Sequence, residues 1–179
     1  GNVAAGKYND GIADNRELFA GRIHDAMVAA EKAAKHHQLT ELRWVVESVL
    51  LPPRPDLEEE TLLAHIQAEL TEEKDLSKAA LMLTYLRRRE LPISVTSLHF
   101  GGETAILHLP GETFIEYQLH AQETRPDAFV AVAGYGDLGP GYITLERSFS
   151  QGGYEPTDAF VSGASEAILC TAIERVLNQ

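Results

Sequence analysis

The chain has 179 residues, of which 44% are hydrophobic and 23% charged, so it is long enough and apolar enough to bury a sizeable core rather than stay disordered. Its 15 lysines and arginines stand against 27 acids, and the net charge of −12 makes nucleic acid and anionic membrane surfaces poor partners. No apolar run approaches the roughly 20 residues of a transmembrane segment, and a single cysteine, Cys170, rules out an internal disulfide.

The first half of the chain predicts three helices and one strand. Their ranges are 15–37 (helix), 42–51 (strand), 56–70 (helix) and 75–89 (helix). Asp14 and Glu17 form a capping-box-like start to the first helix. The acidic run at 58–60 suits the positive N-terminal end of the helix at 56–70, and the arginine run at 87–89 suits the negative C-terminal end of the helix at 75–89. We interpret both runs as solvated helix ends.

The second half predicts a hairpin, a helix, a strand and a terminal helix. Their ranges are 93–100 and 104–109 (strands), 114–123 (helix), 129–133 (strand) and 165–177 (helix). The uninterrupted apolar run at 129–133 is typical of a strand buried on both faces, and a glycine-rich loop is expected at 134–141. Cys170 falls in the apolar pattern of the last helix and is expected to pack in the core.

These elements predict an α/β fold in one domain over residues 1–179. It has a mixed sheet with a βαβ crossover in its C-terminal half, flanked by helices. In such a crossover the two strands are parallel and end at the same edge of the sheet, which is where ligands bind. Glu112 follows the first strand and residues 134–142 follow the second, so we expect both to face one cleft.

Two patterns near this cleft have simpler explanations. Residues 134–139 match the dinucleotide fingerprint G-x-G-x-x-G, but the Gly-Pro-Gly at 139–141 breaks the helix that such a site requires. Glu112, Glu116 and His120 are spaced like metal ligands on a helix, yet Thr113 and Glu116 form a capping box and His120 suits a solvated surface.

Three segments resemble the neutral/alkaline nonlysosomal ceramidase family, especially its short bacterial members. Residues 1–5 are similar to a Gly-Asp-Val-Ser-Pro stretch, and residues 109–113 are similar to a Pro-Gly-Glu motif that follows a strand. Residues 134–155 are similar to a segment that ends in Tyr-Glu, with the best matches at 142–144 and 154–155.

The resemblance implies a zinc site built from two histidines, one glutamate and one tyrosine. Glu112 then corresponds to the ligand glutamate, Tyr142 to the ligand tyrosine, and Tyr154 to the tyrosine that holds and polarises the scissile amide. The two histidines would belong to a part of the polypeptide before Gly1. The chain would therefore be the C-terminal part of a larger hydrolase domain, inactive alone, with that N-terminal part as its partner and a secreted location compatible with the family.

The chain departs from the family pattern at two positions that bear on the substrate. Ala4 stands where the family has serine, and residues 137–139 replace an Asn-x-Tyr sequence. We also expect the chain to lack the family's C-terminal immunoglobulin-like domain, which would follow Gln179. We therefore expect a small amide or lipid-like substrate rather than ceramide in particular. A non-catalytic binding or scaffold domain of the same fold is the alternative, and a structural α/β module without zinc is a third.

Overall fold

A computed structural model describes residues 1–3, 10–36, 38–70, 76–136 and 139–179. The chain divides into two compact units, one formed by Gly1–Asn2 with Glu41–Gln179 and the other by Val3–Thr40. Within the described residues, no helix is both long and apolar enough to cross a membrane. That the 179 residues belong to a larger domain stays a prediction.

The described part of the smaller unit contains one helix, α1 (Asn15–Ala33), which ends before residues 34–36 of the predicted range, while residue 37 lies outside the described residues. The capping box expected at its start is wrong, because the Asp14 side chain accepts no capping hydrogen bond. Asp10 lies there instead: its Oδ1 accepts hydrogen bonds from the Ile12 amide at 3.1 Å and from the Asn15 side chain at 2.6 Å.

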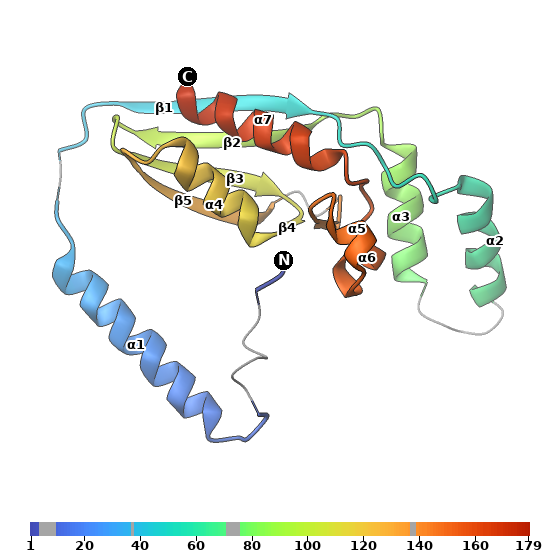
Figure 1. Cartoon of the computed structure of the whole chain (residues 1–179), viewed down its shortest axis with the longest axis horizontal. Helices are drawn as coiled ribbons and strands as arrows, with labels where there is room; N and C mark the ends of the chain where they lie inside the picture. Colours follow the sequence, from blue (N-terminus) through green and yellow to red (C-terminus); the bar gives the residue numbers. More distant parts are fainter. Residues whose placement is uncertain (4–9, 37, 71–75, 137–138) are drawn as a thin grey trace. The chain divides into compact units, whose positions relative to one another are not determined.

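The larger unit contains every other described element (Figure 1). In chain order these are β1 (Leu42–Val49), α2 (Glu59–Leu70), α3 (Ser77–Arg87), β2 (Ile93–Phe100), β3 (Thr104–Pro110), β4 (Glu112–Thr113), α4 (Ile115–Thr124), β5 (Phe129–Gly136), β6 (Tyr142–Ile143), α5 (Ser148–Gln151), α6 (Tyr154–Asp158) and α7 (Ser165–Asn178). The predicted long elements are present within a few residues of their expected ends. The short ones, β4, β6, α5 and α6, were not predicted.

The mixed α/β sheet is confirmed. Its strand order is β1-β2-β3-β5, with β1 and β2, and β2 and β3, antiparallel, whereas β3 and β5 are parallel. The chain passes from β3 to β5 through α4, which makes the predicted βαβ crossover. The carboxyl ends of β3 and β5 therefore lie side by side, and both β4 and β6 begin close to this edge.

Helices α4 and α7 cover one face of the sheet, because alternate strand residues on that face are apolar and small enough to pack against them (Figure 1). Val95, Leu107 and Val130 on the strands are at most 3% exposed, as are Leu169 and Ile173 of α7. Burying each such side chain contributes about 1.5–3 kcal/mol. This packing fixes the sheet whose edge carries the candidate site.

The prediction that residues 129–133 are buried on both faces is wrong, because β5 is an edge strand. Val130 is 3% exposed beneath α4, but Phe129 is 69% exposed on the opposite face. An apolar run cannot by itself distinguish a central strand from an edge strand with one uncovered face. The same strand continues through Gly136, so residues 134–136, predicted as loop, are strand.

Candidate functional site

The site begins at a sharp turn that projects Glu112 from the end of β3. Gly111 has a φ of +62°, a conformation that favours glycine. A Cβ at this position would lie 2.6 Å from the Gly141 carbonyl oxygen and 2.8 Å from Pro140 Cγ, so the glycine also permits close approach of the two loops. The Pro-Gly-Glu order in the sequence thus has a structural reason: only glycine lets the chain turn here into β4.

Glu112 and Tyr142 are direct partners in the parallel pair formed by β4 and β6. The Glu112 amide donates to the Gly141 carbonyl at 2.8 Å, and the Phe114 amide donates to the Ile143 carbonyl at 3.2 Å. Register partners in a parallel pair project their side chains on the same side. Both side chains accordingly line one cavity of about 290 Å³.

A second tyrosine, Tyr135, approaches the same glutamate from the end of β5. It is the non-glycine residue with positive φ, +64°, among the described residues. Its amide donates to the Gly111 carbonyl at 2.7 Å, and its hydroxyl donates to Glu112 Oε1 at 3.4 Å. In the sequence Tyr135 belongs to the false dinucleotide motif at 134–139 and was not predicted as a site residue. A positive φ at a bulky residue is uncommon and is found preferentially at functional sites, but this conformation cannot be read from a sequence.

The Glu112 carboxylate affects both phenols around it. Burial raises the pKa of Tyr142, and the negative charge of Glu112 beside it raises this pKa further. The charge of Glu112 is the main cause that raises the pKa of the exposed Tyr135. Both phenols are thus neutral donors near a carboxylate at neutral pH.

Tyr154, the third site residue predicted, lies at the start of α6 with its ring edge-on to Tyr142. The ring centroids are 6.0 Å apart and the planes meet at 80°. Its side chain is 66% exposed, which leaves its hydroxyl open to solvent or to a ligand.

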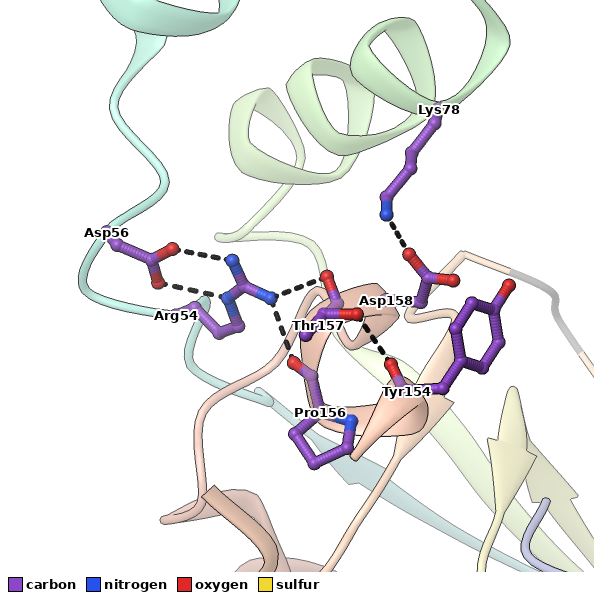
Figure 2. A network of polar contacts seen from close by, with 7 residues as sticks. All are labelled: Arg54, Asp56, Lys78, Tyr154, Pro156, Thr157 and Asp158. Carbon is purple, nitrogen blue, oxygen red and sulfur yellow. Dashed lines mark hydrogen bonds and ion pairs between the residues drawn. The ribbon is translucent and has the colours of Figure 1, made fainter. Parts of the chain in front are cut away.

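Helix α6, which carries Tyr154, is fastened to the loop after β1 by Arg54 (Figure 2). Arg54 binds Asp56 through two hydrogen bonds, of 3.0 and 2.5 Å, and its Nη1 donates to the carbonyls of Pro156 and Thr157 at 2.9 Å each. The Thr157 hydroxyl in turn donates to the Tyr154 carbonyl at 2.6 Å. A planar guanidinium can satisfy this set of acceptors at once, so Arg54 is well suited to hold α6 in place.

The cavity has one ion pair on its wall, between Lys78 of α3 and Asp158 of α6. Figure 2 shows Lys78 reaching down from α3 to the Asp158 carboxylate. Leu81 and Phe160 add apolar wall. The cavity thus presents a carboxylate and two phenols opposite a paired charge and apolar side chains, which is a surface suited to a small, partly polar molecule.

Thr113 and Glu116, which were predicted to form a capping box near the site, make other contacts. The Thr113–Glu116 capping box is wrong: Thr113 lies in β4, and the α4 amide of Ile115 donates instead to the Asn2 side chain at 2.8 Å. Burial opposes ionisation of Glu116, but hydrogen bonds from Asn2 at 2.9 Å and Arg147 at 3.0 Å outweigh it and lower the pKa of this carboxyl. Glu116 therefore has a structural role, although not the predicted one.

His99, His108 and His120 are not among the residues that line this cavity. His120 Nε2 lies 3.3 Å from Glu174 Oε1 on α7, and His99 is buried with its Nε2 2.9 Å from the Val176 carbonyl oxygen. His108 lines a separate cavity with Trp44. Among the described residues, no group of three or more histidine, cysteine, aspartate or glutamate side chains is arranged to hold a metal. A four-ligand zinc shell therefore fits these residues only in part, with Glu112 and Tyr142 as oxygen donors.

Gly1 lies directly against this pair of residues. A Cβ on Gly1 would come within 2.7 Å of the Glu112 carbonyl oxygen and 3.2 Å of Tyr142 Cδ1. The segments that begin at Gly1, at Leu109 and at Gly134, far apart in the sequence, thus meet at one place in the fold. Ala4, Asp137 and Leu138, at which the chain departs from the family pattern, lie outside the described residues.

Comparison with known proteins gives only weak similarity, and only to solved structures. No protein-family model matches the chain, and no curated protein matches it in sequence. A solved structure of a ceramidase complexed with C2 is similar at a TM-score of 0.42 and 14% identity, over 48% of this chain and 14% of that chain. The similarity covers a small part of that ceramidase and does not establish a shared fold or activity.

Proposed function

We propose that this chain supplies part of the active site of a zinc-dependent hydrolase that acts on an amide bond in a small or lipid-like substrate. In this proposal Glu112 and Tyr142 are two of the metal ligands, and Tyr154 contacts the substrate. The remaining two ligands would be nitrogen atoms of histidine side chains, which are not assigned to residues of this chain. The observation that carries the proposal is the meeting of Gly1, Glu112 and Tyr142, because each belongs to a segment that resembles the same hydrolase family.

Each residue has a role that its chemistry allows. The Glu112 carboxylate is an anionic oxygen ligand, and the Tyr142 phenol becomes a ligand when a cation lowers its pKa. A bound zinc ion would supply an activated water and polarise the carbonyl oxygen. The Tyr154 hydroxyl, exposed beside Tyr142, would donate a hydrogen bond to the oxygen on which charge develops.

A non-catalytic binding or scaffold domain is the second candidate. It is favoured by one specific observation, the incomplete donor set among the described residues. This candidate uses the same cavity for a ligand but requires no metal at Glu112. Metal binding at Glu112 therefore separates the two candidates.

The test is a calorimetric titration of the 179-residue chain with zinc, with and without added imidazole. Imidazole is the side-chain group of histidine and can complete the shell in place of two absent histidines. We expect imidazole to tighten zinc binding and Glu112→Gln to remove this gain, because glutamine keeps the size of the side chain but not its charge. Tyr142→Phe should reduce the gain less, and Tyr154→Phe should leave it unchanged.

Glu116→Gln is the matched control, since Glu116 is a nearby carboxylate on α4 that is held by Asn2 and Arg147. It should leave the imidazole-dependent zinc binding intact. If Glu116→Gln weakens binding as much as Glu112→Gln, the ligand assignment is wrong. If no variant matters and zinc binds only at histidines, the binding-domain candidate replaces the hydrolase.

A further inference from the structure

A second cavity of the larger unit lies along α3 and shares Leu81 with the cavity of the candidate site. It measures about 480 Å³ and is lined by residues of α3, the loop after α3 and the start of β2, together with Leu51, which follows β1, and Gly139. Leu51 and Tyr85 are its buried floor, at 2% and 7% exposed, while Leu81 and Leu91 are apolar walls that are more than half exposed. Its volume falls within the range of about 300–1,000 Å³ for small-molecule sites.

A hydrogen bond joins the two residues that form the floor of this cavity. The Tyr85 hydroxyl donates to the Leu51 carbonyl at 2.7 Å, and burial raises the pKa of Tyr85 to about 12. The phenol therefore stays neutral and bound at physiological pH, and it presents its ring to the cavity. The apolar surface here can receive a hydrocarbon chain without leaving a buried polar group unpaired.

Two guanidinium groups, Arg88 and Arg89, lie at the rim of the same cavity. No aspartate or glutamate is among its described lining residues, although the chain has 27 acids and a net charge of −12. Arg87, the preceding residue, is paired with Glu59 at 2.6 Å, whereas the Arg88 guanidinium has no hydrogen bond or ion pair with any residue that the structure describes. Arg89 lies 3.6 Å from the Glu90 carboxylate and donates to the Leu86 carbonyl at 3.2 Å. The run predicted as a solvated helix end thus contains three differently held guanidinium groups, of which Arg88 is the unpaired one among the described residues.

We propose that this cavity binds an amphiphile with an anionic head group, a carboxylate or a phosphate, on an apolar chain. Arg88 and Arg89 would bind the head group, since guanidinium matches both anions through paired hydrogen bonds. Leu81, Leu91 and Tyr85 would contact the chain. The proposal concerns a binding site and requires neither zinc nor hydrolysis at Glu112.

The position of the cavity gives this site a connection to the candidate active site. Leu81 lines both cavities, with Arg88 two helical turns further along α3 on one side and Lys78 about one turn back on the other. A ligand in the larger cavity would thus have its apolar chain close to the wall of the cavity that contains Glu112.

The test is a calorimetric titration of the 179-residue chain with decanoate, decyl phosphate and decanol, all as monomers. We expect one or both anions to bind at least about tenfold more tightly than decanol, since a charge-assisted hydrogen bond contributes about 1.5–3 kcal/mol. The tighter of the two anions identifies the head group. Leu91→Asn should weaken the binding of all three ligands about fivefold, because it removes apolar contact with the chain.

Arg88→Gln is the decisive variant and Arg87→Gln its control, because both remove one charge from the same exposed run and only Arg88 lines the cavity. Arg88→Gln should weaken anion binding about tenfold and leave decanol unchanged. Equal losses in the two variants, or decanol binding as tightly as the anions, would overturn the proposal. Failure of all three ligands to bind would overturn it too, whatever the outcome of the zinc titration at Glu112.

Discussion

At the scale of single residues, Glu112 connects the parts of the candidate site. Its amide is bound to the Gly141 carbonyl, its carboxylate receives the Tyr135 hydroxyl, and its side chain lies on the same side of the β4–β6 pair as Tyr142. Removing its charge while keeping its shape should therefore change the pKa values of the neighbouring tyrosines without changing the fold. Glu112→Gln makes this substitution.

The first prediction concerns the ionisation of the two phenols. A carboxylate beside a phenol opposes formation of a second negative charge, so the pKa values of Tyr135 and Tyr142 lie above the usual value of about 10. In Glu112→Gln both pKa values should fall. The fall should be larger at Tyr135, whose pKa is raised mainly by the charge of Glu112, than at Tyr142, whose pKa is raised mainly by burial. Ultraviolet titration of tyrosinate in the Tyr135→Phe and Tyr142→Phe backgrounds assigns the two changes. Identical titration curves with and without the Glu112 charge would contradict the geometry of the site.

At the scale of elements, the site depends on the shortest strands of the fold. The pair formed by β4 and β6 has two residues in each strand and is held by the turn at Gly111 and by the loop ending at Gly141. Arg54 holds the neighbouring helix α6 in place through backbone carbonyls. These contacts position Tyr142 and Tyr154, while the four-stranded sheet supplies the rigid support beneath them.

The second prediction compares two glycine substitutions with the same backbone conformation. Gly111 and Gly101 have φ values of +62° and +63°, but a Cβ at Gly101 meets nothing within 4 Å. Gly101→Ala should cost about 1 kcal/mol in the free energy of unfolding, from the conformation alone. Gly111→Ala adds the clash with the Gly141 carbonyl and should cost about 1–3 kcal/mol more.

Urea denaturation of both variants measures this difference. Gly111→Ala should also lower the raised pKa of Tyr142, because separating β4 from β6 moves the phenol from Glu112, whereas Gly101→Ala should not. Equal destabilisation of the two variants would mean that the close approach of the two loops has no energetic consequence.

The elements that were predictable from the sequence are those long enough to show a period. The strands at 93–100 and 104–110 and the helices at 115–124 and 165–178 repeat their apolar residues several times, and this suffices to predict a βαβ crossover and the edge where Glu112 lies. Strands of two residues have no period, so β4 and β6 escaped prediction. The wrong capping box has the same origin: Thr113 pairs in β4, which leaves Asn2, more than 100 residues away, to bind the Ile115 amide.

The candidate site itself was predictable only as far as local motifs reach. Glu112, Tyr142 and Tyr154 were named from their segments, and the structure brings the three together, although their roles stay predictions. Tyr135 and the contact of Gly1 with Glu112 depend on tertiary approach and on a positive φ, which no local pattern encodes. The separate behaviour of Arg87 and Arg88 could not be predicted for the same reason, since it depends on Glu59 of another helix.

At the scale of the whole molecule, the larger unit combines a buried sheet core with an incomplete set of metal donors among the described residues. The larger unit has its core between the sheet and α4 and α7, and the candidate site and the α3 cavity both lie in this unit. The described residues provide Glu112 and Tyr142 but no assigned histidine ligand. We therefore expect the chain to show no zinc-dependent amide hydrolysis by itself, and metal binding rather than turnover is the property to measure.

The most direct measurement is the location of zinc in crystals of the chain grown with zinc and imidazole. An anomalous difference map at the zinc absorption edge should show a peak between the Glu112 carboxylate and the Tyr142 hydroxyl, about 2.0–2.2 Å from a carboxylate oxygen. The peak should be absent from crystals of Glu112→Gln and present in crystals of Glu116→Gln. A strongest peak at His120 and Glu174, with no density beside Glu112, would contradict the claim that these residues form part of a metal site.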